Sequence, residues 1–258
     1  MGNKNKVAVI ITTYNEENNI RECVRSAKHL TDNIIVIDTT STDQTVSIAQ
    51  ELKCKIIQYP YTVYVEPTRD FALQQTDAEW VFILDADERI TPKLAVEVLN
   101  TITSTNKTHY KILRQNIFAK TKWLKHGGWY PDYIIRLIRK DAFLQWPKEI
   151  HSTPRIKGEM GYLKEPLVHE FHSSLESMVE KTIIFENVES NLLFKAKRKS
   201  GILIFLRKFL GELYRRFVKW GGFLDGTPGI IESLYQAYSK TITYLMLYEK
   251  TKRKSTTI

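Results

Sequence analysis

The first part of the chain, through about residue 105, alternates short apolar runs rich in β-branched side chains with segments of helical periodicity. Runs typical of strands occupy residues 7–12, 34–38, 55–59 and 80–85, and helical patterns occupy 19–30, 43–52, 67–76 and the segment after Pro92. Strands that are apolar on both faces belong in a parallel sheet covered by helices, because only there are both faces buried. The alternation therefore predicts an α/β fold with a doubly wound, Rossmann-like and mostly parallel sheet flanked by helices.

The residue pattern changes twice in the rest of the chain. Residues 108–170 mix tryptophans and tyrosines with glycines and prolines. This mixture is typical of short strands and long loops that line a pocket, or of a small aromatic core beneath loops. After about residue 173 the pattern predicts helices to the end.

The composition suits a globular protein, since 43% of the 258 residues are hydrophobic and 26% are charged. Cys23 and Cys54 lack the spacing of metal ligands, which favours a reducing compartment. The longest apolar runs fall far short of the ~20 residues that span a bilayer. No signal-peptide pattern precedes the first predicted strand. We therefore expect a cytoplasmic protein.

The positive charge is concentrated at one end of the chain. Residues 195–258 hold 14 Lys and Arg against 4 Asp and Glu, a net charge of +10, whereas residues 1–194 carry a net charge of −1. A basic segment beside a neutral body favours an anionic membrane surface or nucleic acid as partner, although a solvated tail has the same composition.

Polar residues gather directly after three of the predicted strands, at 12–16, 38–43 and 85–88. In sheets of this kind ligands bind beyond the carboxyl ends of the strands, so these segments are the candidate site. Any one of them could be a turn or a helix cap, and Asp43 in front of a predicted helix has the pattern of an N-cap.

Asp85 and Asp87 form an Asp-x-Asp pair after a buried strand. Two carboxylates this close repel each other unless a cation or water relieves them, and oxygen ligands favour Mg²⁺ or Mn²⁺ together with substrate phosphate. The alternative is a polar turn that caps the following helix. The chain lacks the glycine-rich fingerprints of dinucleotide-binding domains and P-loop NTPases and the G-x-S-x-G of α/β hydrolases, which argues against those classes.

Four segments, in this order and spacing, resemble the nucleotide-sugar-binding half of family 2 glycosyltransferases with the GT-A fold: VAVIITTYNEENNIRECVRSA, IIVIDTTSTDQTVSIA, TRDFAL and WVFILDADE. Later segments resemble the subgroup that includes lipopolysaccharide core β-glucosyltransferases: HGGWYPDYIIRL, EIHS, LVHEFH and GGFLDGTPGIIESLYQAY. The resemblance covers essentially the whole chain and implies a UDP-linked hexose donor, glucose above all.

Roles for the nucleotide side of the site follow from the resemblance. It implies that Thr12, Tyr14 and Glu16 lie against the base and ribose, and that Asp38 accepts a hydrogen bond from the base. Arg69 would pair with the base edge or a phosphate.

The resemblance also implies that Asp85 and Asp87 form the metal and sugar-diphosphate site. Either His151 or His169 is a candidate to complete the metal shell, although a lone histidine is more often structural. The chain has Thr40 where the family pattern has glycine, which bears on the geometry of that turn.

Asp132 is the candidate catalytic base for an inverting transfer, which needs a carboxylate to accept the proton of the acceptor hydroxyl. It follows an aromatic, glycine-rich loop and precedes a predicted strand over 133–138. The alternative is that Asp132 only pairs with Arg136 or Arg139 at the surface.

Residues 202–220 form an amphipathic pattern on a helical wheel. Bulky apolar residues lie on one side and basic residues on the other, with further basic residues at 195–199 and 250–254. This pattern is typical of a helix at an anionic membrane surface, or of a helix packed on the catalytic domain. No nucleic-acid-binding signature is present, so we expect no nucleic-acid partner.

Together these features predict a GT-A domain over 1–190 and a basic, helical, membrane-associating region over 191–258. Within the first, 1–107 would bind the nucleotide sugar and 108–190 the acceptor, a saccharide or lipid-linked saccharide of cell-surface or lipopolysaccharide biosynthesis. We expect the enzyme on the inner face of the cell membrane. The alternatives are a sugar-nucleotide nucleotidyltransferase, disfavoured by the missing glycine-rich phosphate loop, and a non-catalytic membrane-associated partner.

Overall fold

The computed structural model describes residues 6–171 and 175–256. The chain forms two compact units, which we call the sheet unit and the helical unit. The sheet unit comprises Met1–Gln115 and Asp132–Glu170, and the helical unit comprises Asn116–Pro131 and Phe171–Ile258. The boundary expected near residue 190 lies within the long helix α5 (Leu175–Lys195), and so inside the helical unit.

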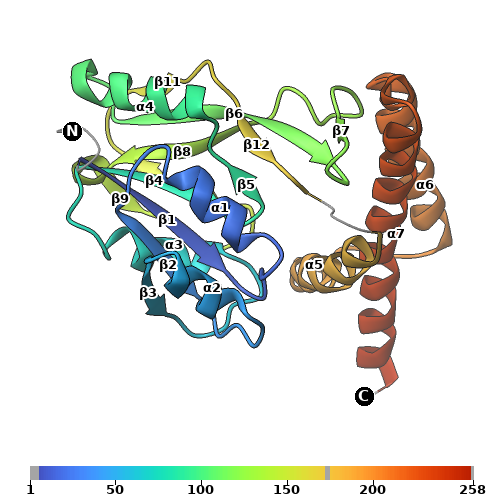
Figure 1. Cartoon of the computed structure of the whole chain (residues 1–258). Coiled ribbons are helices and arrows are strands. Elements are labelled where there is room, and N and C mark those ends of the chain that lie inside the picture. The colour runs from blue at the N-terminus through green and yellow to red at the C-terminus, as the bar shows by residue number, and fades with distance from the viewer. Residues whose placement is uncertain (1–5, 172–174, 257–258) are drawn as a thin grey trace. The chain divides into compact units, whose positions relative to one another are not determined.

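The sheet unit confirms the predicted α/β class (Figure 1). Its core is four parallel strands in the order β3 (Lys55–Gln58), β2 (Ile34–Asp38), β1 (Val7–Thr13) and β4 (Trp80–Asp85). The sheet continues with β8 (Tyr133–Arg139), antiparallel to β4, and β6 (His109–Phe118), antiparallel to β8. All four strands predicted in the first part of the chain, and the one predicted at 133–138, are present.

Shorter strands complete the sheet around β6. They are β5 (Glu88–Arg89), β7 (Lys122–Trp123), β11 (Met160–Tyr162) and β12 (Leu167–His169). A separate antiparallel pair is formed by β9 (Phe143–Gln145) and β10 (Arg155–Ile156). Short strands joined by loops are the arrangement expected for residues 108–170.

Helices cover both faces of the parallel strands, at the places where the sequence predicts them. They are α1 (Ile20–Ala27), α2 (Thr45–Glu51), α3 (Glu66–Leu73) and α4 (Pro92–Ser104). Strand β1 shows why its sequence is apolar throughout, since Val9 and Ile11 pack in one hydrophobic cluster and Ile10 packs in another. Helices α1, α2 and α4 contribute to the first cluster and α3 to the second.

The helical unit is built on α7 (Thr227–Thr256), which contacts both α5 and α6 (Ile202–Leu213). A π-helical turn (Tyr214–Lys219) and a 3-10 turn (Gly222–Asp225) join α6 to α7. Figure 1 shows α6 beside α7. Among the helices of residues 6–171 and 175–256, none is long and apolar enough to cross a membrane.

Helix α6 carries apolar side chains on two sides rather than one. On the side facing α7, the ring of Phe205 lies 6.0 Å from that of Tyr248. On the outer side Leu203, Leu206 and Leu210 are exposed. One face of α6 therefore packs against α7 within the helical unit and the opposite face is exposed, and association of this helix with a membrane stays a prediction.

Two glycine-containing segments that are far apart in the chain bind each other in the helical unit. Gly127 donates its N–H to the carbonyl of Trp220 at 2.9 Å, and a side chain at Gly128, where φ is +86°, would meet the Trp220 ring. The buried carboxylate of Asp225 accepts from the N–H of His126 at 2.7 Å and lies 2.9 Å from its Nδ1. These contacts explain why both segments need glycine beside aromatic residues.

Glu232 gives the helical unit a stability that depends on pH. Its side chain on α7 is only 1% exposed, and burial raises its pKa to about 7, against lowering effects of Gln236 and Arg216. A carboxyl whose pKa is higher in the folded than in the unfolded state loses stabilisation as the pH rises through the folded value. We expect the free energy of unfolding to fall between pH ~5 and pH ~8.

Replacing Glu232 by glutamine should remove this dependence and raise the free energy of unfolding at pH ~8 by roughly 2–3 kcal/mol. Urea denaturation at several pH values measures the free energy of unfolding of both proteins. Glu249→Gln is the matched control, since Glu249 is an exposed residue of the same helix. If the free energy of unfolding changed equally with pH in wild type and in Glu232→Gln, the prediction would be contradicted.

Candidate active site

The register of the parallel strands aligns the three polar segments along one edge of the sheet. Thr12 at the end of β1 pairs with Asp85 at the end of β4, and Thr13 pairs with Asp38 at the end of β2. Because these strands run in the same direction, the segments that follow them leave the sheet at its carboxyl edge. The juxtaposition expected from the sequence is therefore present.

The segments after β1 and β2 bind each other. Asn15 donates its N–H to Ser41 Oγ at 2.9 Å and accepts at its side-chain oxygen from the N–H of Thr42 at 2.8 Å. The N–H of Glu16 donates to Thr45 Oγ1 at 2.8 Å, at the first residue of α2. These bonds hold the backbone of both segments in place before any ligand binds.

The Asp38–Asp43 turn has a left-handed backbone at the position where the sequence departs from the family pattern. Thr40 stands where glycine is usual and has a φ of +66°, a region that β-branched residues rarely adopt. Asp43 accepts from the N–H of Thr45 at 2.9 Å and from that of Glu17 at 3.1 Å, so it supports the start of α2 as its sequence position suggests. Burial would raise the pKa of Asp43, but these hydrogen bonds keep it lowered.

Asp38 and Arg69 are both almost completely buried and keep polar atoms that have no hydrogen-bond partner among residues 6–171 and 175–256. One oxygen of Asp38 accepts from the N–H of Ser41 at 3.1 Å, and the other has no partner. Arg69 on α3 binds Asp85 through Nη2, while its Nε and Nη1 have no partner. Buried polar groups are normally satisfied, so these atoms are candidates to bind a ligand.

Tyr14, another residue expected on the nucleotide side of the site, is exposed, and its ring lies 4.7 Å from that of Tyr61. Thr12 is buried, and its hydroxyl lies 3.4 Å from that of Thr68. Glu16 uses its carboxylate locally, since it accepts from the side chain of Asn19 at 2.6 Å. No pattern in the sequence identifies Tyr61 as a candidate, because only the fold places it beside Tyr14.

Asp85 lies between two arginines. One carboxylate oxygen binds Arg69 and the other binds Arg136 on β8. Burial alone would raise the pKa of Asp85, but the charges of Arg136 and Arg69 more than offset it and hold that pKa well below its usual range. Asp85 is therefore ionised at any physiological pH.

The ion pairs continue from Asp85 toward the candidate base. Arg136 also lies 2.6 Å from the fully buried Glu88, and Glu88 lies 3.7 Å from Arg114 on β6. Burial would lower the pKa of Arg136, but Asp85 and Glu88 raise it. Arg114 then binds Asp132, with an Nη2–Oδ2 distance of 2.7 Å. We call this chain of alternating charges the ion-pair network.

The partner of Asp132 differs from both alternatives considered from the sequence. It is Arg114, whose backbone N–H also donates to the Asp132 carbonyl at 2.7 Å. Arg136 binds Asp85 and Glu88 instead, and Arg139 binds Asp141. Sequence reasoning missed Arg114 because only the antiparallel pairing of β6 with β8 brings it beside Asp132.

Asp87 and one of the two candidate histidines lie together. Strand β12 pairs with β5 so that His169 lies opposite Glu88, and His169 Nε2 is 3.5 Å from Asp87 Oδ2. His151 lies after β9, where its N–H donates to Glu66 at 2.8 Å. Of the two histidines, His169 is therefore the one placed beside the Asp-x-Asp pair.

A metal ion at Asp87 would need ligands from a substrate. In the part of the chain that the structure describes, no group of three or more His, Cys, Asp or Glu residues could hold a metal ion. Mg²⁺ typically takes one or two carboxylates, with water and substrate phosphates filling its shell. A carboxylate and an imidazole at the sheet edge fit an ion of this kind that binds together with a diphosphate.

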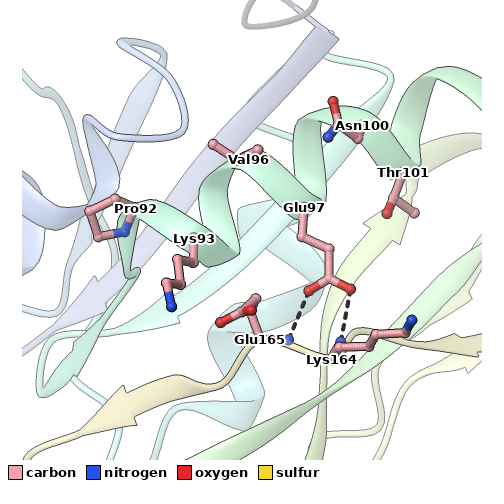
Figure 2. Close-up of a pocket in the computed structure, with 8 residues that line it drawn as sticks. All are labelled: Pro92, Lys93, Val96, Glu97, Asn100, Thr101, Lys164 and Glu165. Carbon is pink, nitrogen blue, oxygen red and sulfur yellow. Dashed lines mark hydrogen bonds between the residues drawn. The ribbon is translucent and has the colours of Figure 1, made fainter.

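The sheet unit also has an open pocket of about 610 Å³ that contains none of the candidate residues. Figure 2 shows its lining, which comes from one side of α4 and the turn at 164–165: Pro92, Lys93, Val96, Glu97, Asn100, Thr101, Lys164 and Glu165. The carboxylate of Glu97 accepts from the backbone N–H groups of Lys164 and Glu165, both at 2.8 Å. Its charge therefore holds the turn, and we assign this pocket no ligand.

Comparisons with known proteins find relatives over most of the chain. The model of the family described as "Glycosyl transferase family 2" matches residues 8–167, a range that includes Asp38, Asp85, Asp87 and Asp132 but not His169. An uncharacterized glycosyltransferase of Rickettsia conorii is 24% identical over 98% of this chain and 93% of its own length. The lipopolysaccharide core biosynthesis glycosyltransferase LpsC of Rhizobium meliloti is 24% identical over 95% of this chain and 92% of its own length.

Solved structures of similar proteins are more distant. The crystal structure of S. aureus TarS 1-349 is 16% identical, covers 97% of this chain and 92% of its own, and has a TM-score of 0.48. That of glucosyl-3-phosphoglycerate synthase from Mycobacterium tuberculosis, in complex with Mn²⁺, UDP and glucosyl-3-phosphoglycerate, is 13% identical with a TM-score of 0.45 and covers 76% of this chain and 81% of its own.

The ion-pair network makes Arg136 important for stability. Arg136→Met would leave the carboxylates of Asp85 and Glu88 without their shared cation, and breaking a buried ion pair in this way typically costs about 3–5 kcal/mol. Arg139→Met on the same strand is the control, because its partner Asp141 is exposed, and it should cost less than about 1 kcal/mol. Urea denaturation measures both, and equal losses would show that the network does not stabilise the sheet unit.

Proposed function

Because the chain belongs to glycosyl transferase family 2, we propose that it is a metal-dependent, inverting hexosyltransferase with a UDP-linked donor, glucose being the first choice of sugar. The acceptor in this proposal is a saccharide or lipid-linked saccharide of cell-surface polysaccharide or lipopolysaccharide biosynthesis. The similarity to LpsC over nearly the whole chain supports the acceptor class.

One observation carries the choice of a uridine nucleotide. Among the residues that the structure describes, a buried carboxylate oxygen of Asp38 has no partner, and neither have two buried guanidinium nitrogens of Arg69 at the same edge. Uracil offers a ring N–H to a carboxylate and carbonyl oxygens to N–H donors, so it would satisfy both residues. The exposed ring of Tyr14, beside Tyr61, offers a surface on which the base would stack. Thr12 and Glu16 border this position.

We propose that Asp87 and His169 hold a Mn²⁺ or Mg²⁺ ion together with the donor diphosphate. When bound, the ion would neutralise charge on the departing diphosphate. Asp85 belongs to the same sugar-diphosphate position, where Arg69 and Arg136 keep it ionised and hold its carboxylate in one orientation.

Asp132 is the proposed base. Its carboxylate accepts the proton of the acceptor hydroxyl as that oxygen forms a bond to the anomeric carbon, and the bond from this carbon to the diphosphate oxygen breaks to release UDP. Attack from the face opposite the leaving group inverts the configuration. Next to Asp132, the exposed rings of Tyr133 and Tyr162 lie 5.3 Å apart and offer an apolar surface for a sugar ring.

We also propose that the enzyme works as a peripheral protein on the inner face of the cell membrane, through residues 195–258. The net charge of +10 in this segment supports attraction to anionic lipids. A lipid-linked acceptor would explain why a sugar transferase needs the membrane surface.

The test is release of UDP from a panel of UDP-sugars, with and without Mn²⁺. Wild type should show turnover that Mn²⁺ increases. Asp87→Ala should lose that increase, and Asp38→Ala should weaken binding of UDP. Asp132→Asn should lower turnover by about 100-fold or more with UDP affinity unchanged, because removal of a general base affects the chemical step.

Asp77→Ala, at an exposed aspartate of the sheet unit, is the control and should behave as wild type. Unchanged turnover in Asp87→Ala would refute the metal site. Release of pyrophosphate from UTP and a sugar phosphate would instead support the nucleotidyltransferase alternative. Wild type without turnover on any donor would support a non-catalytic partner.

A further inference from the structure

The helical unit brings two basic segments together although they are far apart in the chain. One begins at the last residue of α5 and covers residues 195–199, and the other lies near the end of α7 and covers 250–254. The ammonium group of Lys250 donates to the carbonyl and side-chain oxygens of Asn187, at 3.2 and 2.7 Å, and to Ser190 Oγ at 2.5 Å. Helices α5 and α7 therefore lie side by side at Asn187, Ser190 and Lys250, in the C-terminal half of each helix.

The first turn of α6 lies at the same end of the unit. Phe205 in this turn packs against Tyr248, within one turn of Lys252, and the Lys252 ammonium group lies 5.6 Å from the Tyr248 ring centre. Helix α6 begins at Ile202, directly after the basic segment 195–199. The start of α6 thus lies beside the C-terminal part of α7, which Lys250 also joins to α5.

We call this end of the helical unit the basic pole. Its exposed cations are Lys195, Lys197, Arg198, Lys199, Lys252 and Arg253. Within this group, Arg253 has a nearby anion, Glu249, with which it forms an ion pair.

Two large apolar side chains lie next to these cations. Leu203 is 78% exposed and Ile202 is 69% exposed, which makes them the most exposed large hydrophobic residues in the part of the chain that the structure describes. Leu206 and Leu210 continue the exposed apolar side along α6. Apolar side chains this exposed, close in the chain to the basic segment 195–199, favour a partner that is both anionic and able to bury them.

Resting on the membrane association proposed above, we infer that the basic pole is the surface that docks on a bilayer of anionic lipid, with Ile202 and Leu203 inserted among the acyl chains and the surrounding cations at the headgroups. A bilayer offers negative charge at its surface and an apolar layer a few ångströms below it. Nucleic acid would match the charge, but its phosphate surface offers no place to bury Ile202 and Leu203.

Vesicle binding by the full chain tests the inference. Wild type should float with vesicles of phosphatidylcholine and phosphatidylglycerol and should not float with phosphatidylcholine alone. Lys197→Glu/Arg198→Glu/Lys199→Glu should weaken binding by at least about tenfold, since each basic residue contributes separately near an anionic surface. Lys53→Glu/Lys93→Glu/Lys164→Glu makes the same change of net charge at exposed lysines of the sheet unit and should bind within about twofold of wild type.

A second variant tests the insertion of apolar side chains separately from the attraction between opposite charges. Ile202→Ser/Leu203→Ser keeps every cation and should also lose at least about tenfold in binding, whereas Leu234→Ser, at an exposed leucine of α7, should not. The substituted side chains are exposed, and circular dichroism checks that each variant is folded.

Three results would overturn the inference. If the basic-pole variants bind vesicles as wild type does, the membrane contact lies elsewhere on the chain. If wild type binds duplex DNA and not anionic vesicles, the pole recognises nucleic acid. If wild type binds neither, the proposed membrane association itself fails, and UDP-sugar turnover decides separately whether the proposed enzyme activity survives.

Discussion

The ion-pair network is the interaction on which the candidate site depends. It runs from Arg69 through Asp85, Arg136 and Glu88 to Arg114 and Asp132, with charges of alternating sign. Burying one charge is costly, but each member here has an opposite charge beside it, so the group is stable only as a whole. Its members come from α3, β4, β5, β6, β8 and the loop before β8, and the network therefore ties these elements together.

The same network prepares the site for its proposed chemistry. It keeps Asp85 ionised and fixes the carboxylate beside the proposed sugar-diphosphate position. It also connects that position to Asp132, the proposed base, through side chains that already have defined partners. A site whose charged groups are placed before the substrate binds needs little reorganisation during the reaction. In contrast, Asp38 keeps an unpartnered oxygen, as a group reserved for a ligand would.

The structure shows on which elements the basic residues of the C-terminal segment lie. Composition alone assigns the positive charge to residues 195–258. Helical periodicity alone assigns part of it to one face of an amphipathic helix over 202–220. In the folded unit, the aromatic residue Phe205 is used in packing against α7, while Ile202 and Leu203 are left exposed beside basic residues from two segments. The surface proposed to meet the membrane thus adds Leu203 and the two basic segments to part of the apolar side predicted from periodicity, which includes Ile202.

Local patterns in the sequence were sufficient for the α/β class, for the four parallel strands and the helices of the first part of the chain, and for the polar segments at the carboxyl edge of the sheet, but not for the short strand β5. They were sufficient because strand and helix periodicities, and the residues that directly follow a strand, are properties of neighbouring residues. What only the tertiary structure decided was pairing: Arg114 rather than Arg136 beside Asp132, His169 rather than His151 beside Asp87, and Lys250 of α7 beside Asn187 of α5. Such pairs depend on strand register and helix packing, which join residues far apart in the chain, and no local pattern records them.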